Sequence, residues 1–275
     1  KHLKYRISRK EFAIGPRGNY LSQFKGEGID FYGFRQYTFE DDASNIDWTA
    51  SARTDELLVR EFVQEKSLHF MVMLDTSSSM FFTSHEKLKC EFAAEVAAAI
   101  SFSVAYTGNN VGLCIFNNGV QKIVDSSRGM GQYHRITSLL HEEQYYGGDK
   151  HYNSSFSYLV NAFKKHAVVF VISDFFDFGQ ENEDFIRSLT GKFEVIGIMV
   201  RDIAEREMPK VGKVCIEDPK TGEQLLVDSS QLAEEYYEEA SKQEEEIKDM
   251  FLRNNLFFHR VYTDEDIGEA LTRIY

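Results

Sequence analysis

The sequence has little of what marks several large protein classes. It holds three prolines, one tryptophan and three cysteines in 275 residues, and the cysteines stand far apart without a C-x-x-C spacing. This argues against a disulfide framework or a cysteine zinc site, so we expect three buried thiols in a reducing, cytoplasmic compartment. The longest apolar runs, such as residues 167–172, fall far short of the roughly 20 residues that a membrane helix needs. We therefore expect no membrane span in this chain.

Positive charge is also scarce. The chain has 31 Lys and Arg against 44 Asp and Glu, which gives a formal net charge of −13. Without excess basic residues to neutralise phosphates, the sequence argues against nonspecific nucleic-acid binding. The acidic run at 232–249 is typical of the solvated face of a helix. A Walker A pattern is absent from the sequence, so we do not expect the chain to hydrolyse ATP itself.

What is present is an alternation of short apolar runs with helical patterns from about residue 66. The patterns predict strands at 68–74, 111–116, 121–124, 167–175, 193–200 and 256–263, and helices at 86–106, 130–142, 154–165, 180–191, 230–254 and 264–275. Near-continuous apolar strands between helices favour an α/β fold: a doubly wound, mostly parallel central sheet flanked by helices. Residues 213–228 are predicted to form an inserted β-hairpin.

The first 65 residues differ from the rest. They carry glycines, aromatics and charge but no helical period, which predicts an extended, partly β-stranded segment. Such a segment is short for a core of its own, so we expect residues 1–65 to pack on a main domain at 66–275. Trp48 is the expected packing anchor, and ion pairs of Arg35, Asp47 and Arg53 are expected to fix the segment to the sheet.

The stretch MVMLDTSSSM, residues 71–80, is the most informative in the chain. A helix cap explains it poorly, because the next helical pattern begins only at residue 86. An aspartic protease would carry glycine where Ser77 stands, and an α/β pattern follows here instead of further strands. A serine nucleophile would need an elbow of the form G-x-S-x-G, which the sequence lacks.

A metal site accounts for the stretch better. Asp75, Ser77 and Ser79 follow a buried strand at spacings i, i+2 and i+4, so one loop can direct three oxygens to the same point. Asp174 ends another apolar strand, and ligands of open α/β sheets bind at the carboxyl ends of the strands. Hard ions such as Mg²⁺ prefer these oxygen ligands.

On these residues the chain resembles the von Willebrand factor type A domain, whose metal-ion-dependent adhesion site uses Asp-x-Ser-x-Ser, a later threonine and a final aspartate. The resemblance implies Mg²⁺, or else Mn²⁺ or Ca²⁺, on Asp75, Ser77, Ser79 and Asp174. The threonine is where the chain departs from the family, because Gly147 and Gly148 are followed by Asp149 and a small insertion. Ser154 is the expected replacement, as a hydroxyl substitutes best.

The segment before the metal-site strand narrows the family. It resembles the bacterial and archaeal group called domain of unknown function 58 at Phe24, Gly26, Gly28, Arg35, Tyr37, Asp41, Asp42, Ile46, Asp47, Trp48, Ala52 and Arg53. It departs from that group at Phe39 and Glu40, where proline and glycine are usual. The resemblance implies an association with AAA+ ATPases of the MoxR type, in the assembly or maturation of protein complexes.

Together these features predict a non-enzymatic, divalent-metal-dependent protein-binding module, acting as partner or adaptor of a MoxR-type AAA+ ATPase or its client. An ion with few direct carboxylate ligands keeps net positive charge, so it would accept an acidic side chain from the partner. Two alternatives stay open. One is a metal-dependent hydrolase of phosphate esters, and the other is a scaffold with a degenerate metal site.

Overall fold

The structure, a computed structural model, describes residues 25–39, 41–54, 56–63, 68–164, 166–217 and 224–274. Within these ranges the chain forms two compact units, residues 25–63 and residues 68–274.

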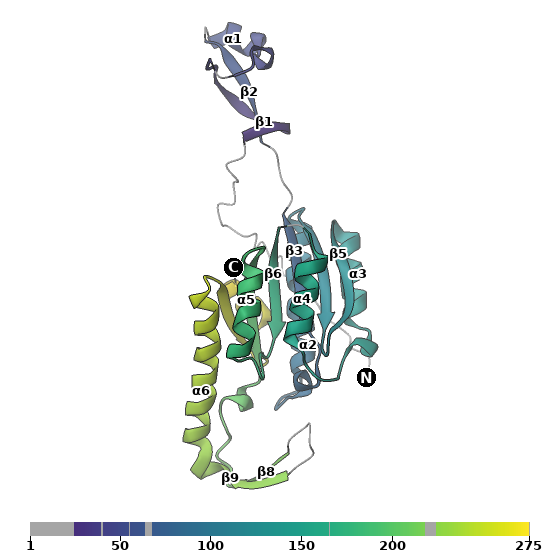
Figure 1. Cartoon of the computed structure of the whole chain (residues 1–275), viewed down its shortest axis with the longest axis vertical. Coiled ribbons are helices and arrows are strands. Elements are labelled where there is room, and N and C mark those ends of the chain that lie inside the picture. The colour runs from purple at the N-terminus through teal and green to yellow at the C-terminus, as the bar shows by residue number, and fades with distance from the viewer. Residues whose placement is uncertain are drawn as a thin grey trace. The chain divides into compact units, whose positions relative to one another are not determined.

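A six-stranded sheet organises the larger unit (Figure 1). Its spatial order is β10-β7-β6-β3-β4-β5, and all neighbours are parallel except β4 and β5, which form an antiparallel hairpin. The strands are β3 (His69–Asp75), β4 (Asn110–Phe116), β5 (Val120–Arg128), β6 (Ala167–Ser173), β7 (Phe193–Arg201) and β10 (Phe257–Tyr262). This mostly parallel, helix-flanked sheet confirms the predicted fold class.

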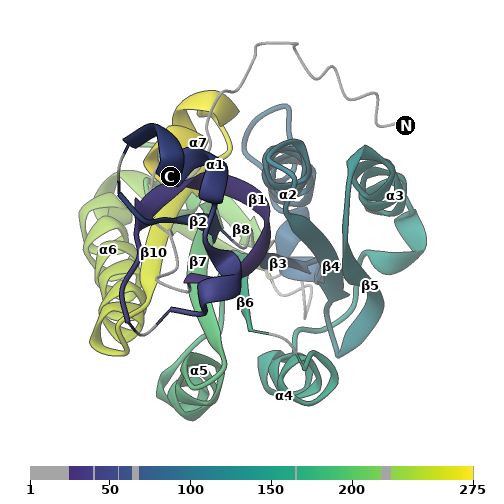
Figure 2. The same cartoon turned by 90° about the horizontal axis from the view of Figure 1, so that it is seen from above.

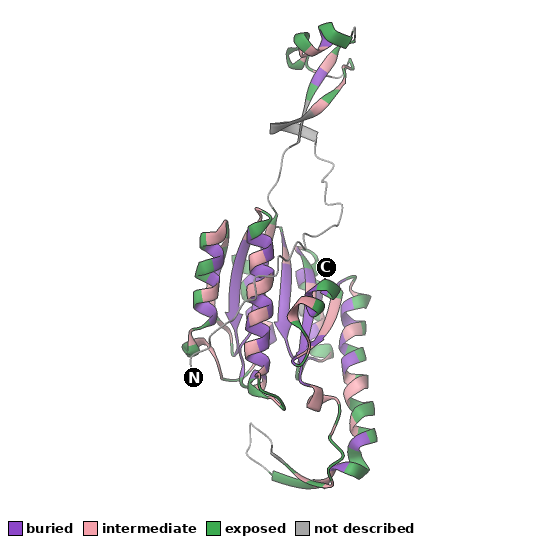
Figure 3. Ribbon diagram, turned by 180° about the vertical axis from the view of Figure 1, so that it is seen from behind, coloured by how far each residue is buried: buried purple, intermediate pink, exposed green. Residues whose placement is uncertain are grey.

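Helices cover both faces of this sheet (Figure 2). One face packs against α2 (Lys89–Tyr106), α3 (Met130–Leu140) and α7 (Ile267–Ile274), and the other against α4 (Tyr152–Ala162), α5 (Glu183–Thr190) and α6 (Ser229–Arg253). The acidic run at 232–249 lies in α6, where Ala233, Glu244 and Ile247 are buried and most acidic side chains are exposed (Figure 3). The solvated helix face predicted there is therefore observed.

The strand β3 lies inside the sheet and is buried on both faces. Successive side chains of a strand point to opposite faces, so Met71 and Met73 join one apolar cluster while Val72 and Leu74 join the other. All four are fully buried. A continuous apolar run is what a strand covered on both faces requires, and it brings Asp75 to the carboxyl edge of the sheet, where β3 and β6 end.

A β-hairpin projects beyond this carboxyl edge (Figures 1 and 3). Its strands are β8 (Lys213–Glu217) and β9 (Gln224–Asp228), which pair antiparallel as predicted. Leu225 and Leu226 are 65% and 66% exposed. Cys215, on β8, is exposed as well, so the prediction of three buried thiols is wrong for this one. A two-stranded ribbon has too few layers to bury it, whereas Cys90 and Cys114 are buried in the larger unit.

The smaller unit pairs β1 (Lys25–Gln36) with β2 (Leu58–Val63) antiparallel and carries a short helix, α1 (Trp48–Thr54). The sequence did not predict this helix; the side chain of Asp47 begins it by accepting hydrogen bonds from the amides of Thr49 and Ala50. Asp47 also forms an ion pair with Arg60. The packing of this segment on the main domain stays a prediction.

The smaller unit also contains Arg35 and Trp48, which were expected to attach it to the sheet. Arg35 forms a bidentate ion pair with Asp41, inside the unit itself. Trp48, the expected anchor, is 67% exposed. In neither unit is any described helix both long and apolar enough to cross a membrane.

Candidate functional site

Two neighbouring strands bring two carboxylates to the carboxyl edge of the sheet. β3 ends at Asp75, and Asp174 comes directly after the last residue of β6. The strands are parallel, with Leu74 opposite Ile172, so Asp75 lies level with Ser173 and Asp174 follows one residue further along the same edge. Both side chains are fully buried. A buried carboxylate is costly unless a charge or hydrogen bonds compensate it, so their partners decide what this site is.

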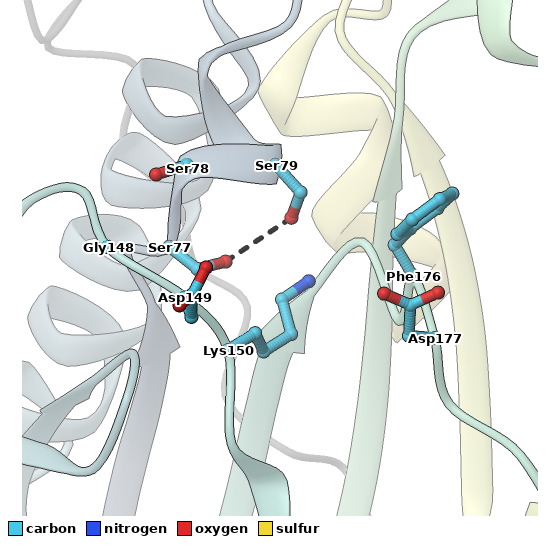
Figure 4. Close-up of a pocket in the computed structure, with 8 residues that line it drawn as sticks. All are labelled: Ser77, Ser78, Ser79, Gly148, Asp149, Lys150, Phe176 and Asp177. Carbon is cyan, nitrogen blue, oxygen red and sulfur yellow. Dashed lines mark hydrogen bonds between the residues drawn. The ribbon is translucent and has the colours of Figure 1, made fainter. Parts of the chain in front are cut away.

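The ammonium group of Lys150 lies between the two carboxylates. Its Nζ is 2.9 Å from Asp75 Oδ2 and also donates a short hydrogen bond to Asp174 Oδ1. The Lys150 side chain is only 9% exposed. In Figure 4 it points from the loop at 148–150 into a pocket. The pocket lies between the loop after β3 that carries Ser77, Ser78 and Ser79, which we name the serine loop, and the segment after β6. Lys150 thus links the ends of β3 and β6.

A second buried lysine, Lys89, binds the other oxygen of Asp174. Lys89, at the start of α2, is 1% exposed and donates to Asp174 Oδ2 at 2.8 Å and to Glu205 Oε1 at 2.5 Å. Charges therefore alternate from Asp75 through Lys150, Asp174 and Lys89 to Glu205. We name these five residues the charge cluster.

Neutral donors of the chain satisfy the same carboxylates. Asp75 accepts hydrogen bonds from the Ser77 amide at 2.9 Å on Oδ1 and from the Ser173 hydroxyl at 2.6 Å on Oδ2. Asp174 Oδ1 accepts from the Phe176 amide at 3.0 Å, besides its two lysine partners. All four carboxylate oxygens therefore have a donor within the chain.

These surroundings hold Asp174 and Lys150 in their charged forms. Burial would raise the pKa of Asp174, but Lys150 and Lys89 outweigh it, so the pKa lies well below its usual range. Burial would likewise favour the neutral amine of Lys150, but Asp75 and Asp174 hold the pKa of Lys150 well above its usual range. Asp174 and Lys150 are therefore an ion pair at neutral pH.

The serine loop forms one wall of a pocket above the charge cluster. Ser77 Oγ and Ser79 Oγ lie 3.2 Å apart, and Ser77 is buried. The pocket is lined by Ser77, Ser78, Ser79, Gly148, Asp149, Lys150, Phe176 and Asp177 (Figure 4). The structure thus brings Asp75, Ser77, Ser79 and Asp174, predicted as metal ligands, to one place.

The loop that carries Lys150 is fixed on both sides of the lysine. The Gly147 amide donates to the Thr76 carbonyl at 2.7 Å, and the Gly148 carbonyl accepts from the Ser78 amide at 2.8 Å. On the far side, the His151 amide donates to the Asn117 carbonyl at 2.8 Å. Gly147 and Gly148 have φ values of +103° and +83°, which L-residues with a side chain rarely adopt. Lys150 is therefore positioned by the backbone, and not only by its own ion pairs.

The segment after β6 is conformationally strained. Phe175 and Asp177 both have positive φ, +51° and +58°, although neither is glycine. Phe175 is fully buried and packs edge-on against Phe251 and Phe178, which compensates for its backbone. Such strain persists only where the surroundings enforce it, and it is typical of functional sites. Here it flanks Asp174 at the mouth of the pocket.

Ser154 lies elsewhere. It is exposed in the first turn of α4, its hydroxyl donates to the His151 carbonyl at 3.2 Å, and it does not line the pocket. Its role as a metal ligand stays a prediction.

Sequence reasoning missed Lys89 and Lys150. For Lys150 a signal existed, because a basic residue stands directly after Gly-Gly-Asp, where the threonine was sought.

As arranged, these residues do not fit the divalent ion that the resemblance implies. The position that a cation would take between Asp75 and Asp174 belongs to Lys150 Nζ. Lys150 pairs with both aspartates, and Lys89 is shared between Asp174 and Glu205. A divalent ion would need the Lys150 ammonium to leave, because two cations cannot share that space. The predicted Mg²⁺ stays a prediction.

Comparison with known proteins places the chain among relatives. The family described as "Protein of unknown function DUF58" matches residues 33–246. The chain is 27% identical over 211 residues to "Uncharacterized protein Mb1516" of Mycobacterium bovis and "Uncharacterized protein Rv1480" of Mycobacterium tuberculosis. The match covers 74% of this chain and 65% of each relative, so the chain spans just under two thirds of their length.

Comparison with solved structures also finds similar chains. An aerotolerance-related membrane protein from Bacteroides fragilis has a TM-score of 0.51 at 15% identity, over 76% of this chain and 96% of that one. BatB from Bacteroides thetaiotaomicron gives 0.49 at 13%, over 76% and 97%. The VWA domain of SpRpn10 gives 0.43 at 10%, over 75% and 95%. The family resemblance noted in the sequence is confirmed by the match over residues 33–246, and the Bacteroides fragilis structure shares the fold.

Proposed function

We propose that this chain, which belongs to the family of proteins of unknown function DUF58, is a non-enzymatic protein-binding module that works with a AAA+ ATPase of the MoxR type. The binding surface would be the carboxyl edge of the sheet, with the pocket at its centre. The family resemblance supports the ATPase part of the proposal, and the surface of the chain supports the binding part.

The observation that carries the proposal is an exposed apolar surface around this edge. Phe81 and Phe82 follow the serine loop and are each 43% exposed, and Phe176 in the pocket wall is 41% exposed. Leu225 and Leu226 add two exposed side chains from the projecting hairpin. We name these five residues the apolar rim. Exposed large apolar side chains are typical of protein-binding surfaces, and here they come from two loops at this edge and from the hairpin.

The rim is attached to a rigid base. The ring of Phe82 has the Lys89 ammonium 5.9 Å from its centroid, so this part of the rim lies against the charge cluster. Phe176 follows Asp174 by two residues and its amide donates to that carboxylate. A preorganised surface loses less conformational entropy on binding, which favours affinity.

The test measures binding of the purified chain to the purified MoxR-type AAA+ ATPase encoded in the same genome. Replacing the hairpin pair by Leu225→Ser and Leu226→Ser, or the other side of the rim by Phe82→Ser, should weaken binding at least about tenfold, as expected for central interface side chains.

Leu252→Ser is the matched control. Leu252 is 51% exposed near the end of α6, at the opposite end of that helix from the hairpin, and its loss should leave the affinity unchanged. The proposal is wrong in its ATPase part if the wild type does not bind. It is wrong about the surface if the rim variants and Leu252→Ser bind alike.

A further inference from the structure

We infer that Lys150 is a built-in replacement for the metal ion: its ammonium group occupies the cation position between Asp75 and Asp174, so the site functions without a divalent ion. The part concerning the partner rests on the proposed function. The part concerning the metal rests on the geometry alone.

The first support is that Lys150 makes the contacts a bridging cation would make. It binds one oxygen of each strand-end carboxylate, and it reaches them from the loop that follows Gly147 and Gly148. In the resemblance that the sequence suggested, this loop is the one that supplies a ligand to the ion. Here the loop supplies the positive charge itself.

The second support is that the two aspartates are ion-paired and that their hydrogen bonds are complete. Asp75 pairs with Lys150, Asp174 pairs with both Lys150 and Lys89, and each oxygen of the two aspartates already accepts a bond from the chain. Buried charges are stable when they are paired and their remaining lone pairs are satisfied. The cluster meets these conditions without any added ion.

The third support is that Lys150 is held in place. The backbone of its loop is hydrogen-bonded to the loop after β3 on one side and to Asn117 on the other. Its ammonium also lies 5.5 Å from the centroid of the Tyr152 ring, whose hydroxyl is bonded to Ser173. A lysine that only filled empty space by chance would not need these supports.

The inference predicts that removing the ammonium creates a metal site. In Lys150→Ser, two buried carboxylates and the Ser77 and Ser79 hydroxyls would surround a space with no cation. Oxygen ligands with open positions for water are what Mg²⁺ and Mn²⁺ prefer. The variant should therefore bind a divalent ion that the wild type does not.

The experiment titrates Mn²⁺, then Mg²⁺, into the wild type, Lys150→Ser and Lys248→Ser by calorimetry. Lys248 is partly exposed on α6 and pairs with Glu245, so its replacement changes the net charge equally but away from the site. We expect Lys150→Ser to bind Mn²⁺ at least about tenfold more tightly than the other two. Equal binding by all three proteins, or tight binding by the wild type, overturns the inference.

A second measurement uses only the wild type, in case Lys150→Ser does not fold. Amine-reactive labelling followed by mass spectrometry compares Lys150 with Lys248, with and without Mg²⁺. Lys150 should be protected in both conditions. Labelling of Lys150 that rises when Mg²⁺ is added would show the ion displacing the ammonium, and would contradict the inference.

The partner part has its own readout. Binding of the MoxR-type ATPase to the wild type should not change when EDTA replaces Mg²⁺ in a nucleotide-free buffer. If EDTA abolishes binding while the rim variants are also weak, the inference fails and the proposed function stands. If the rim variants bind like the wild type but calorimetry finds no metal in it, the proposed function fails and the inference stands.

Discussion

The two loops that line the pocket contribute different chemical groups to it. The loop after β3 provides a carboxylate and hydroxyls, Asp75, Ser77 and Ser79, as a metal site would. The loop at 147–151 provides an ammonium group, Lys150, where such a site would need one more oxygen ligand. The comparison teaches that a ligand motif on one loop does not define a metal site, because a facing loop can bring its own cation.

The largest effect should come from the acid that both lysines share. Asp174→Ala leaves Lys89 and Lys150 buried with one partner fewer each, so we expect a loss of about 3 to 5 kcal/mol in the free energy of unfolding. Chemical denaturation measures it. Asp184→Ala, whose side chain is 91% exposed, is the control and should change the stability little. Similar values for the two variants would mean that the charge cluster contributes no stability.

The pH dependence of stability should follow the same acid. Because the folded-state pKa of Asp174 is lowered, its contribution is present above the unfolded pKa of about 3.9 and is lost as the pH falls further. Lys150 has a raised folded-state pKa, so its contribution is present below about pH 10.4 and is lost only at higher pH. Between about pH 5 and 10 Asp174 and Lys150 should therefore add no pH dependence. Unfolding from pH 2 to 6 should show a shallower slope in Asp174→Ala; an unchanged slope would refute this.

A smaller effect should come from the backbone conformation of the loop that carries Lys150. Gly148→Ala places a side chain at φ +83° with nothing nearby to clash, so the cost is conformational, about 1 to 2 kcal/mol. Gly131→Ala, in α3 with equally open surroundings, should instead stabilise by about 0.5 to 1 kcal/mol. Thermal unfolding of both variants tests this, and a neutral Gly148→Ala would mean that the loop tolerates another conformation.

The smallest effect should come from a hydroxyl of the first loop. Ser79 Oγ is bonded to Ser77 Oγ, so Ser79→Ala should lower the free energy of unfolding by no more than about 1 kcal/mol. The change should be the same with Mg²⁺ and with EDTA. A loss that appears only in Mg²⁺ would make Ser79 a metal ligand and would count against Lys150 as the resident cation.

The fold was predictable because its strands are short, continuous apolar runs that alternate with longer helical patterns. The continuous apolar run of β3, for example, follows directly from burial on both faces. The smaller unit was harder, because α1 is short and its start depends on one capping residue, Asp47. Cys215 was predicted as buried from its residue type, but its exposure depends on the single-layered hairpin.

The site was half predictable for a related reason. Short side chains that directly follow a strand, such as Asp75 and Asp174, have little freedom, so spacing places them. A lysine has a long, flexible side chain, so the sequence does not reveal where its ammonium group lies. Lys89 was hidden in the same way, as a polar residue at the start of a helix. Of the predicted alternatives, a scaffold with a degenerate metal site is the one that the position of Lys150 favours.

The most direct test of this account is a crystal structure of the wild type grown with Mn²⁺, with an anomalous difference map calculated at the strand ends. We predict no manganese peak between Asp75 and Asp174, and density for Lys150 Nζ bonded to both. A manganese peak at that point, with Lys150 turned out of the pocket, would contradict the account.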